Sequence, residues 1–410
     1  MSFQQGLSGL NASSKALDSV GNNIANSGTV GFKSATTAFA DVFAATLGSG
    51  SQVGIGTTVA GINQQFTQGN ITVTNNALDL AINGSGFYRL SNNGAITWTR
   101  NGQLNVDKDG YIVNANGYRL TGYLANTSNV IVPSTPAEIF INTSDLQPQA
   151  TGASAGATGL EIGLNLDSRE GVIAAAFNVG DPTTYNSSTS ATVYDSLGNP
   201  HLVSLFFKKT AANQWDLYTN IDGGAATSAA GSPDLVFNNT GTLTTPATGI
   251  VAQSFAVTTG AVTPLNFNLN LTGSTQYGNI FGVNSITQDG YTSGRLSGLS
   301  VASDGTIQGR YSNGQTRDLA QVVLGNFNNP NGLTSLGNNQ WAETADSGQP
   351  LIGVPGSGSL GVIQSAAIEE SNVDLTAELV NMITYQRAYQ ANAQTIKTQD
   401  SILQTLVNLR

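Results

Sequence analysis

The spacing of hydrophobic residues at the two ends of the chain differs from the spacing between them. From Asp374 onward, apolar residues follow one another at steps of about four and three, the pattern of a narrow apolar seam along a helix. The seam residues are Leu375, Leu379, Met382, Tyr389, Ala393, Ile396, Leu403 and Val407, and the pattern is broken at Gln386 and Asp400. A shorter seam runs through the first 27 residues and comprises Phe3, Leu7, Leu10, Leu17 and Ile24. Seams this narrow predict that each terminal helix pairs with another helix, in the same chain or in a neighbouring copy.

Glycine and proline mark the same division of the chain. All 48 Gly and all 11 Pro lie before residue 362. Gly6, Gly9 and Gly21 are expected to weaken the N-terminal helix by up to about 1 kcal/mol each relative to Ala, so this helix needs a partner to form. At the start of the C-terminal helix, Ser371 and Asp374 match an S-x-x-D capping pair.

The middle of the chain has the pattern of antiparallel strands. From Ile71 the hydrophobic period changes to two, and dipeptides that favour tight hairpins recur every seven or eight residues. These turn dipeptides are Asn93-Gly94, Asn101-Gly102, Asp109-Gly110 and Asn116-Gly117. A run of small residues at 150–160 predicts a domain boundary, a second strand-rich region follows it, and similar turn signals return near Gly290.

The order helix, strands, helix predicts a chain that runs outward and returns. The expected fold class is mainly β with coiled-coil-like helical termini and nested, discontinuous domains, of which the inner and outer ones are antiparallel β. The expected domains are a terminal helical assembly domain (1–27 with 372–410), a connecting segment (28–70 with 359–371), an inner β domain (71–145 with 286–358) and an inserted outer β domain (146–285).

Composition excludes several functional classes. Only 10% of residues are charged and the net charge is −10, so a nucleic acid is not an expected partner. The chain has no cysteine, which excludes thiol chemistry and disulfides. The longest apolar run, 172–177, is too short to cross a bilayer, and the first residues lack the pattern of a cleaved leader. Neither membrane insertion nor a cleaved signal peptide is expected.

Candidate chemical motifs have simpler structural interpretations. The single histidine, His201, is expected to be a polar residue at the edge of a strand. Residues 356–361 match a dinucleotide-binding fingerprint but lack the surrounding βαβ pattern. Residues 105–110 resemble half of a calcium loop, yet Asn116 stands where a bidentate Glu is needed. Glu369-Glu370 are expected to favour a helix N-terminus. We therefore expect no catalytic residue, no metal and no cofactor.

The C-terminal helix is unusually poor in charge. An exposed two-stranded coiled coil usually carries Glu and Lys beside its seam, whereas the corresponding residues here are mostly Thr, Asn, Gln, Ser and Ala. This composition favours a helix surrounded by other copies of itself. The alternative is an ordinary helical hairpin that caps a domain.

Several segments resemble the rod and hook proteins of the bacterial flagellum. They are Asn22–Asn26, Thr29–Lys33, Leu78–Ile82, Thr99–Tyr123, Ser371–Leu375 and Gln394–Asp400. Thr192–Trp215 and Leu324–Trp341 are similar to hook proteins in particular. The resemblance covers nearly the whole chain and is weakest at 125–190 and 222–285.

The resemblance implies a structural subunit without catalysis that assembles with itself into a curved, flexible tube, coupling rod to filament and transmitting torque. It implies that the residues of the two seams form the assembly interface. The other implied partners are the rod, the hook cap, the hook–filament junction and the export apparatus. It further implies an extracellular location in the hook, attached to the basal body, after export without a cleaved signal peptide. Two alternatives remain at this point: another axial component (distal rod or hook–filament junction), and a β-rich surface adhesin.

Overall fold

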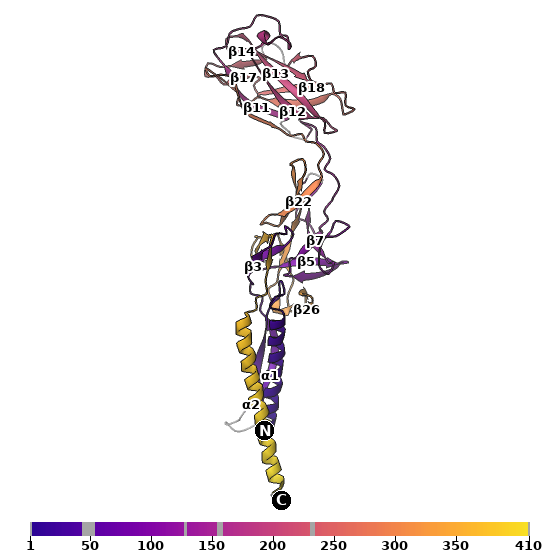
Figure 1. Ribbon diagram of the computed structural model, residues 1–410, viewed down its shortest axis with the longest axis vertical. Coiled ribbons are helices and arrows are strands. Elements are labelled where there is room, and N and C mark those ends of the chain that lie inside the picture. The colour runs from indigo at the N-terminus through magenta and orange to yellow at the C-terminus, as the bar shows by residue number, and fades with distance from the viewer. Residues whose placement is uncertain (1, 43–53, 127–128, 154–158, 230–233, 409–410) are drawn as a thin grey trace. The chain divides into compact units, whose positions relative to one another are not determined.

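The computed structural model describes residues 2–42, 54–126, 129–153, 159–229 and 234–408, with the side chains of residue 2 and of residues 406–408 outside the description. The chain forms two compact units, drawn in Figure 1. Unit 1 comprises Met1–Thr143, Gly298–Arg310 and Thr316–Arg410, and unit 2 comprises Ser144–Ser297 and Tyr311–Gln315. The prediction of a mainly β chain with helical ends is confirmed.

Two helices of unit 1 lie side by side, as Figure 1 shows: α1 (Ser2–Ala25) and α2 (Leu375–Asn408). They are antiparallel, because Gly6 of α1 faces Ile396 whereas Asn23 contacts Glu378. A hairpin of β1 (Ala35–Val42) and β2 (Gly56–Gln64) packs against α1. Phe39 of this hairpin also meets Tyr385 of α2 edge to face, with ring centroids 6.4 Å apart.

The strands of unit 1 come from chain segments that precede and follow unit 2. They are β3 (Ile71–Val73), β4 (Leu80–Asn83), β5 (Phe87–Asn92), β6 (Ala95–Thr99), β7 (Leu104–Val106), β8 (Ile112–Asn114), β9 (Arg119–Leu124), β10 (Ala137–Glu138), β22 (Leu296–Val301), β23 (Thr306–Tyr311), β24 (Thr316–Val322), β25 (Leu324–Asn326), β26 (Thr334–Gly337), β27 (Gln340–Ala342), β28 (Leu351–Gly353), β29 (Val362–Ser365) and β30 (Ala367–Glu369). The main sheet has the order β22-β23-β24-β9-β5-β6-β27-β26. Outgoing strands therefore pair with returning ones, and two small sheets, β3–β30 and β4–β29, repeat this arrangement.

Aromatic side chains fill part of the core of unit 1. Phe87, Trp98, Phe327 and Trp341 are buried together, with edge-to-face ring contacts. The tight turn expected at Asn93-Gly94 joins β5 to β6, and both residues have the positive φ that such a turn requires (50° and 95°). Asn101-Gly102 does not form a hairpin. Gly102 instead passes so close to the backbone of Leu80 that any side chain would collide with its carbonyl oxygen.

Unit 2 consists mainly of two packed sheets. The first has the order β18 (Ile250–Phe255), β19 (Leu265–Asn270), β11 (Leu160–Asp167), β20 (Thr275–Tyr277), with β21 (Gly282–Gln288) also paired to β11. The second has the order β12 (Ser187–Tyr194), β13 (Pro200–Ala211), β14 (Gln214–Ile221), β16 (Leu235–Phe237), β17 (Leu243–Thr245), and β15 (Thr227–Ser228) pairs with β14. Two short 3-10 turns, η1 (Pro182–Thr184) in unit 2 and η2 (Pro330–Gly332) in unit 1, complete the elements.

The core of unit 2 is formed by alternate residues of both sheets, as period-two strands require. Leu160, Ile162, Leu164 and Leu166 of β11 face inward, and Trp215 is fully buried opposite them. One pairing goes beyond the hairpin pattern of the sequence: β11 runs parallel to β19 and β20.

Candidate assembly interface

The face of α1 that is buried in unit 1 consists of small residues. Gly6, Ser13, Ala16, Val20 and Asn23 are all buried, at the heptad-like spacing that keeps side chains on one side of a helix. The large apolar residues of the predicted seam lie one position further along, about 100° around the helix. The small-residue stripe therefore serves contact within the chain, and the seam is displaced from it.

Two glycines allow α1 and α2 to approach closely. A Cβ added at Gly6 would lie 3.1 Å from Cγ1 of Ile396, and one added at Gly9 would lie 2.7 Å from Nδ2 of Asn392. Sequence reasoning treated these glycines only as weak points in α1. The structure gives their physical role, which is to remove the side-chain volume that would keep the helices apart.

The seam residues of α1 remain accessible to different degrees. Phe3 and Leu7 are 45% and 44% exposed, whereas Leu10, Leu17 and Ile24 are half-buried. No large apolar residue of the predicted α1 seam is fully buried within the described part of the chain. These five side chains therefore keep apolar surface that the monomer does not use.

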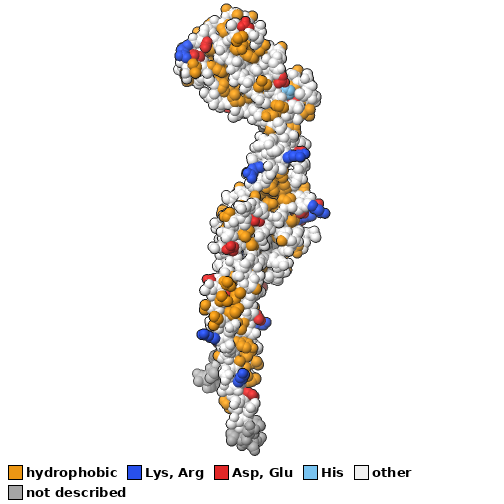
Figure 2. All heavy atoms as spheres, in the orientation of Figure 1, with side chains coloured by type: hydrophobic (Ala, Val, Ile, Leu, Met, Phe, Trp, Pro, Cys, Tyr) orange, Lys and Arg blue, Asp and Glu red, His pale blue; other side chains and the backbone are white. Residues whose placement is uncertain are grey.

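In α2, three of the predicted residues are half-buried and four are exposed. The half-buried ones are Met382, Ala393 and Ile396. The exposed ones are Leu375, Leu379, Tyr389 and Leu403. Val407 lies outside the residues whose side chains are described. Three further exposed apolar residues of α2, Val380, Ile383 and Ile402, were not part of the predicted seam. Figure 2 shows the hydrophobic side chains gathered along the helical end, with few charged ones among them.

The C-terminal part of α2 extends past the end of α1. With 34 residues against 24 and a rise of about 1.5 Å per residue, α2 is about 15 Å longer. Ile396 already lies opposite Gly6, close to the first residue of α1. Steps of three and four carry the stripe that faces α1 from Ile396 through Gln399 to Leu403, where α1 has ended and Leu403 is 51% exposed. Among the described residues, no second helix covers this surface of α2.

Asn23 ties both helices to the hairpin. Its buried side-chain amide donates to the backbone carbonyl of Ala35 at 2.8 Å and to Oε1 of Glu378 at 3.1 Å. Its Oδ1 accepts a hydrogen bond from the backbone N–H of Ala35 at 2.9 Å. This one residue therefore joins the end of α1, the start of β1 and the first turn of α2.

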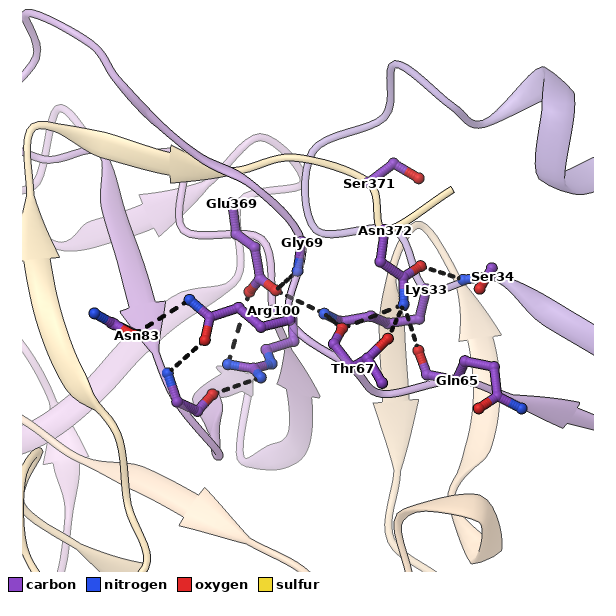
Figure 3. A network of polar contacts seen from close by, with 12 residues as sticks. Lys33, Ser34, Gln65, Thr67, Gly69, Asn83, Arg100, Glu369, Ser371 and Asn372 are labelled. Carbon is purple, nitrogen blue, oxygen red and sulfur yellow. Dashed lines mark hydrogen bonds and ion pairs between the residues drawn. The ribbon is translucent and has the colours of Figure 1, made fainter. Parts of the chain in front are cut away.

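A buried ion cluster lies where the helices meet the strands of unit 1 (Figure 3). Nζ of Lys33 is 2.7 Å from Oε1 of Glu369, and Nη1 of Arg100 is 3.7 Å from Oε2 of the same carboxylate. The exposed fractions of these side chains are 0%, 3% and 0% for Lys33, Arg100 and Glu369. Glu369 also accepts a hydrogen bond from the backbone N–H of Gly69.

Burial dominates the electrostatics of this cluster. It lowers the pKa of Lys33 and the pKa of Arg100, and the positive charge of Arg100 lowers that of Lys33 further. The carboxylate of Glu369 opposes both effects because it stabilises the charged forms of its two partners. Two buried cations thus share one buried carboxylate, and Glu369 is the residue on which the cluster depends.

The cluster also corrects an expectation about Glu369. This residue belongs to β30 and lies well before the start of α2, so it does not act on a helix dipole. Its neighbour Glu370 is exposed. Lys33, Arg100 and Glu369 were missed because their positions in the sequence are far apart. The sequence signal that could have indicated the cluster is a charged residue at a strand position that faces inward, as Glu369 does in β30.

The start of α2 is fixed by short polar side chains. Oδ1 of Asp374 accepts hydrogen bonds from the backbone N–H groups of Thr376 and Ala377, which makes it the N-cap. Ser371 instead accepts from the N–H of Val373, so the expected reciprocal capping pair does not form. Asn372 bonds the strand segments beside it, accepting from the N–H of Ser34 and donating to carbonyl oxygens nearby (Figure 3).

Neither a cluster of metal-ligating side chains nor a membrane-spanning helix is found in the described part of the chain. Among the described residues, no group of three or more His, Cys, Asp or Glu side chains is placed to hold a metal ion. No described helix is both long and apolar enough to cross a membrane. A groove of about 440 Å³ beside the end of α1 is lined largely by polar side chains, among them Asn22, Asn26 and Asn339.

Comparison with known proteins gives matches along most of the chain. Residues 3–33 match the family model described as flagella basal body rod protein, and residues 364–409 match flagellar basal body rod FlgEFG protein C-terminal. Residues 81–152 match flagellar hook protein FlgE/F/G D1 domain, and residues 165–291 match flagellar basal body protein FlaE D2 domain.

Three relatives that match over all or nearly all of their length are flagellar hook proteins. The chain is 45% identical over 417 residues to flagellar hook protein FlgE of Salmonella typhimurium and 44% identical over 420 residues to that of Escherichia coli, with 100% of each chain covered in both cases. Flagellar hook protein FlgE of Borreliella burgdorferi is 34% identical over 448 residues, covering 100% of this chain and 99% of the relative.

Proposed function

This chain belongs to the flagellar hook protein family, and from that premise we propose that its two terminal helices are the surface through which copies of the chain assemble into the hook. The family is structural and non-catalytic, and its members are located in the flagellum. Assembly with flagellar components follows from the same membership.

The observation that carries the proposal is the unused apolar surface of α2. Leu375, Leu379 and Leu403 are 46%, 46% and 51% exposed in the monomer. Burying a fully exposed side chain of this kind contributes roughly 1.5–3 kcal/mol, and about half of that gain remains for residues that are already half-buried. The part of α2 beyond α1 needs a helix from elsewhere to cover Leu403, and a second copy of the chain supplies one with a matching seam.

The low charge of α2 supports the same proposal. Its uncharged polar flanks can be buried against further helices at the modest cost of finding hydrogen-bond partners, whereas unpaired charges could not. We propose that residues 1–27 with 372–410 form the assembly domain, that 28–70 with 359–371 connect it, and that 71–145 with 286–358 and 146–285 form inner and outer β domains. The named seam residues, from Phe3 to Val407, are its contact residues.

The finer architecture is also proposed. The helices would line the inside of a curved, flexible tube, and the β domains would slide past their neighbours as the tube rotates and transmits torque from rod to filament. The subunit would leave the cell through the flagellar export apparatus without a cleaved signal peptide. It would meet the rod, the hook cap and the hook–filament junction at the ends of the tube.

Placing a charge on the exposed seam tests the proposal. Leu403→Asp is expected to abolish tube formation in electron micrographs of the purified chain under polymerising conditions, because an unpaired carboxylate would have to be buried. The monomer should fold normally, since Leu403 is already half exposed. Leu403→Met is the matched control, because it changes the same residue but keeps it apolar and of similar volume. Tubes formed by Leu403→Asp as readily as by Leu403→Met would refute the proposed interface.

A further inference from the structure

The only histidine of the chain lies between two carboxylates in unit 2. His201 is the second residue of β13, near the end of the strand, and it is buried, with 5% of its surface exposed. Its Nδ1 is 2.6 Å from Oδ2 of Asp222, and its Nε2 is 3.3 Å from Oδ2 of Asp195. Both ring nitrogens therefore face a carboxylate oxygen.

This arrangement suits only one protonation state of the ring. A neutral imidazole has one N–H donor and one lone pair, so it can donate to only one of the two carboxylates. The other carboxylate would then face a lone pair of the buried ring. The imidazolium donates from both nitrogens and satisfies both acceptors.

The two carboxylates hold three separate loops. Asp195, in the turn between β12 and β13, is fully buried and accepts hydrogen bonds from the N–H groups of Leu197 and Asn199 and from Oγ1 of Thr259. Thr259 belongs to the loop between β18 and β19, which is also bonded to the first turn through Val262 N–H and Ser196 Oγ. Asp222, at the end of β14, accepts from the N–H of Leu202 with its second oxygen.

The first of these loops also touches the segments where unit 2 begins and ends. A Cβ added at Gly198 would lie 2.7 Å from Cβ of Pro148 and 3.1 Å from Cα of Thr292. Isolated bridges join these same segments at Leu146 and Gly294 and at Gln149 and Tyr291. The loop conformation held by Asp195 is therefore in direct contact with both ends of the inserted sequence.

We propose that His201, Asp195 and Asp222 form a pH-operated latch, which fastens these three loops while the imidazole carries two protons and loosens them when it loses one. A cavity of about 410 Å³ beside the ring gives the loops room to move. It is lined by His201 and Asp222 together with uncharged residues of 221–227 and 254–259. Among the described residues, Asp195 and Asp222 are the charged groups that act on His201.

The direction of the pH dependence follows from these contacts. Burial disfavours the charged ring, but hydrogen bonds and charge interactions with Asp222 and Asp195 outweigh it and raise the pKa of His201. The stabilising effect of the latch is therefore complete below the ordinary histidine pKa of about 6.5. It is lost as the pH rises through the higher value of the folded state.

Proton NMR of the full-length chain tests the latch directly, because a single histidine gives a single Cε1–H resonance to follow. We expect the His201 resonance to titrate above pH 6.5, and to titrate lower in both Asp222→Asn and Asp195→Asn. Asp181→Asn, an exposed carboxylate of the same unit that is not among the groups acting on His201, should leave the titration unchanged. A wild-type titration at or below 6.5, or one that neither latch substitution lowers, overturns the proposal.

Hydrogen exchange supplies a readout of the loops themselves. Between pH 6 and pH 9, the amides of Leu197, Asn199 and Leu202 should lose protection in the wild type relative to His201→Gln at the same pH. The loss should reach tenfold for each unit by which the His201 pKa is raised. Equal protection in the two proteins at both pH values contradicts the latch. Asp222 is half exposed, so Asp222→Asn keeps the NMR test decisive even where Asp195→Asn fails to fold.

Discussion

Replacing Glu369 by Gln should strongly destabilise unit 1. The change keeps the size and shape of the side chain but removes the carboxylate that, within the described part of the chain, balances Lys33 and Arg100. Both cations are almost completely buried, with 0% and 3% of their side chains exposed. They would then face each other without a counterion.

The magnitude follows from what burial does to an unpaired charge. Breaking a buried ion pair by removing one partner costs about 3–5 kcal/mol, which lowers the folding equilibrium constant roughly a hundredfold to several thousandfold. Lys33→Met should cost less than Glu369→Gln, because it leaves one buried cation paired with one buried carboxylate. If side-chain size alone determined the destabilisation, the order of the two variants would be reversed.

The assay is denaturant-dependent hydrogen exchange with mass spectrometry on the full-length chain. Peptides covering 67–105 and 362–372 report the free energy of unfolding around the cluster. Peptides from 187–221 lie in unit 2 and provide an internal control, which matters because a chain with two units does not unfold in one step. Glu370→Gln is the matched control variant, since the same substitution is made one position along at an exposed residue.

Surface substitutions typically change the unfolding free energy by no more than about 0.5 kcal/mol. If the unfolding free energy around the cluster differs by less than this between Glu369→Gln and Glu370→Gln, the charge of Glu369 does not stabilise unit 1. A larger loss for Lys33→Met than for Glu369→Gln would likewise refute the charge balance on which the prediction rests.

Three further predictions concern the helices and the pH dependence of unit 1. Gly9→Leu should separate α1 from α2 at a cost of about 1–3 kcal/mol and reduce the helical circular dichroism signal, whereas Gly9→Ala combined with Asn392→Ala should retain it, because the double change removes the colliding atoms. Asp374→Ala should destabilise the start of α2 by about 1 kcal/mol, seen as faster amide exchange in its first turn, and Asp374→Asn should not. Because burial lowers the pKa of Lys33, the folded unit binds fewer protons there than the unfolded chain. The unfolding free energy should therefore rise with pH up to about 10, and Lys33→Met should flatten that slope in pH-dependent denaturation.

Much of the architecture could be predicted from local patterns. The loss of Gly and Pro after residue 361 and the steps of three and four predicted α2, and the Asn93-Gly94 dipeptide predicted the turn between β5 and β6. Both signals act within a few residues, where backbone geometry is decided. Gly102 shows the limit of this reasoning, because its role depends on Leu80, whose approach no local pattern reveals.

The internal contacts of the candidate interface were harder to predict. The seam was identified by looking for large apolar residues, yet the buried face of α1 is made of small ones, such as Gly6, Ser13 and Ala16. Small residues give a weak hydrophobic signal, but they determine how closely two helices can approach. The ion cluster was invisible for a different reason: Lys33 and Glu369 are separated by more than three hundred positions and meet only after the chain has returned.

The bridges between Leu146 and Gly294 and between Gln149 and Tyr291 hold the two ends of the inserted sequence together. A segment whose ends already lie side by side can be lengthened, shortened or replaced by another domain with neighbouring termini at little entropic cost to the rest of the chain. Grafting a foreign domain between these ends should therefore produce hybrid chains that keep the two helices and the interleaved sheet of unit 1.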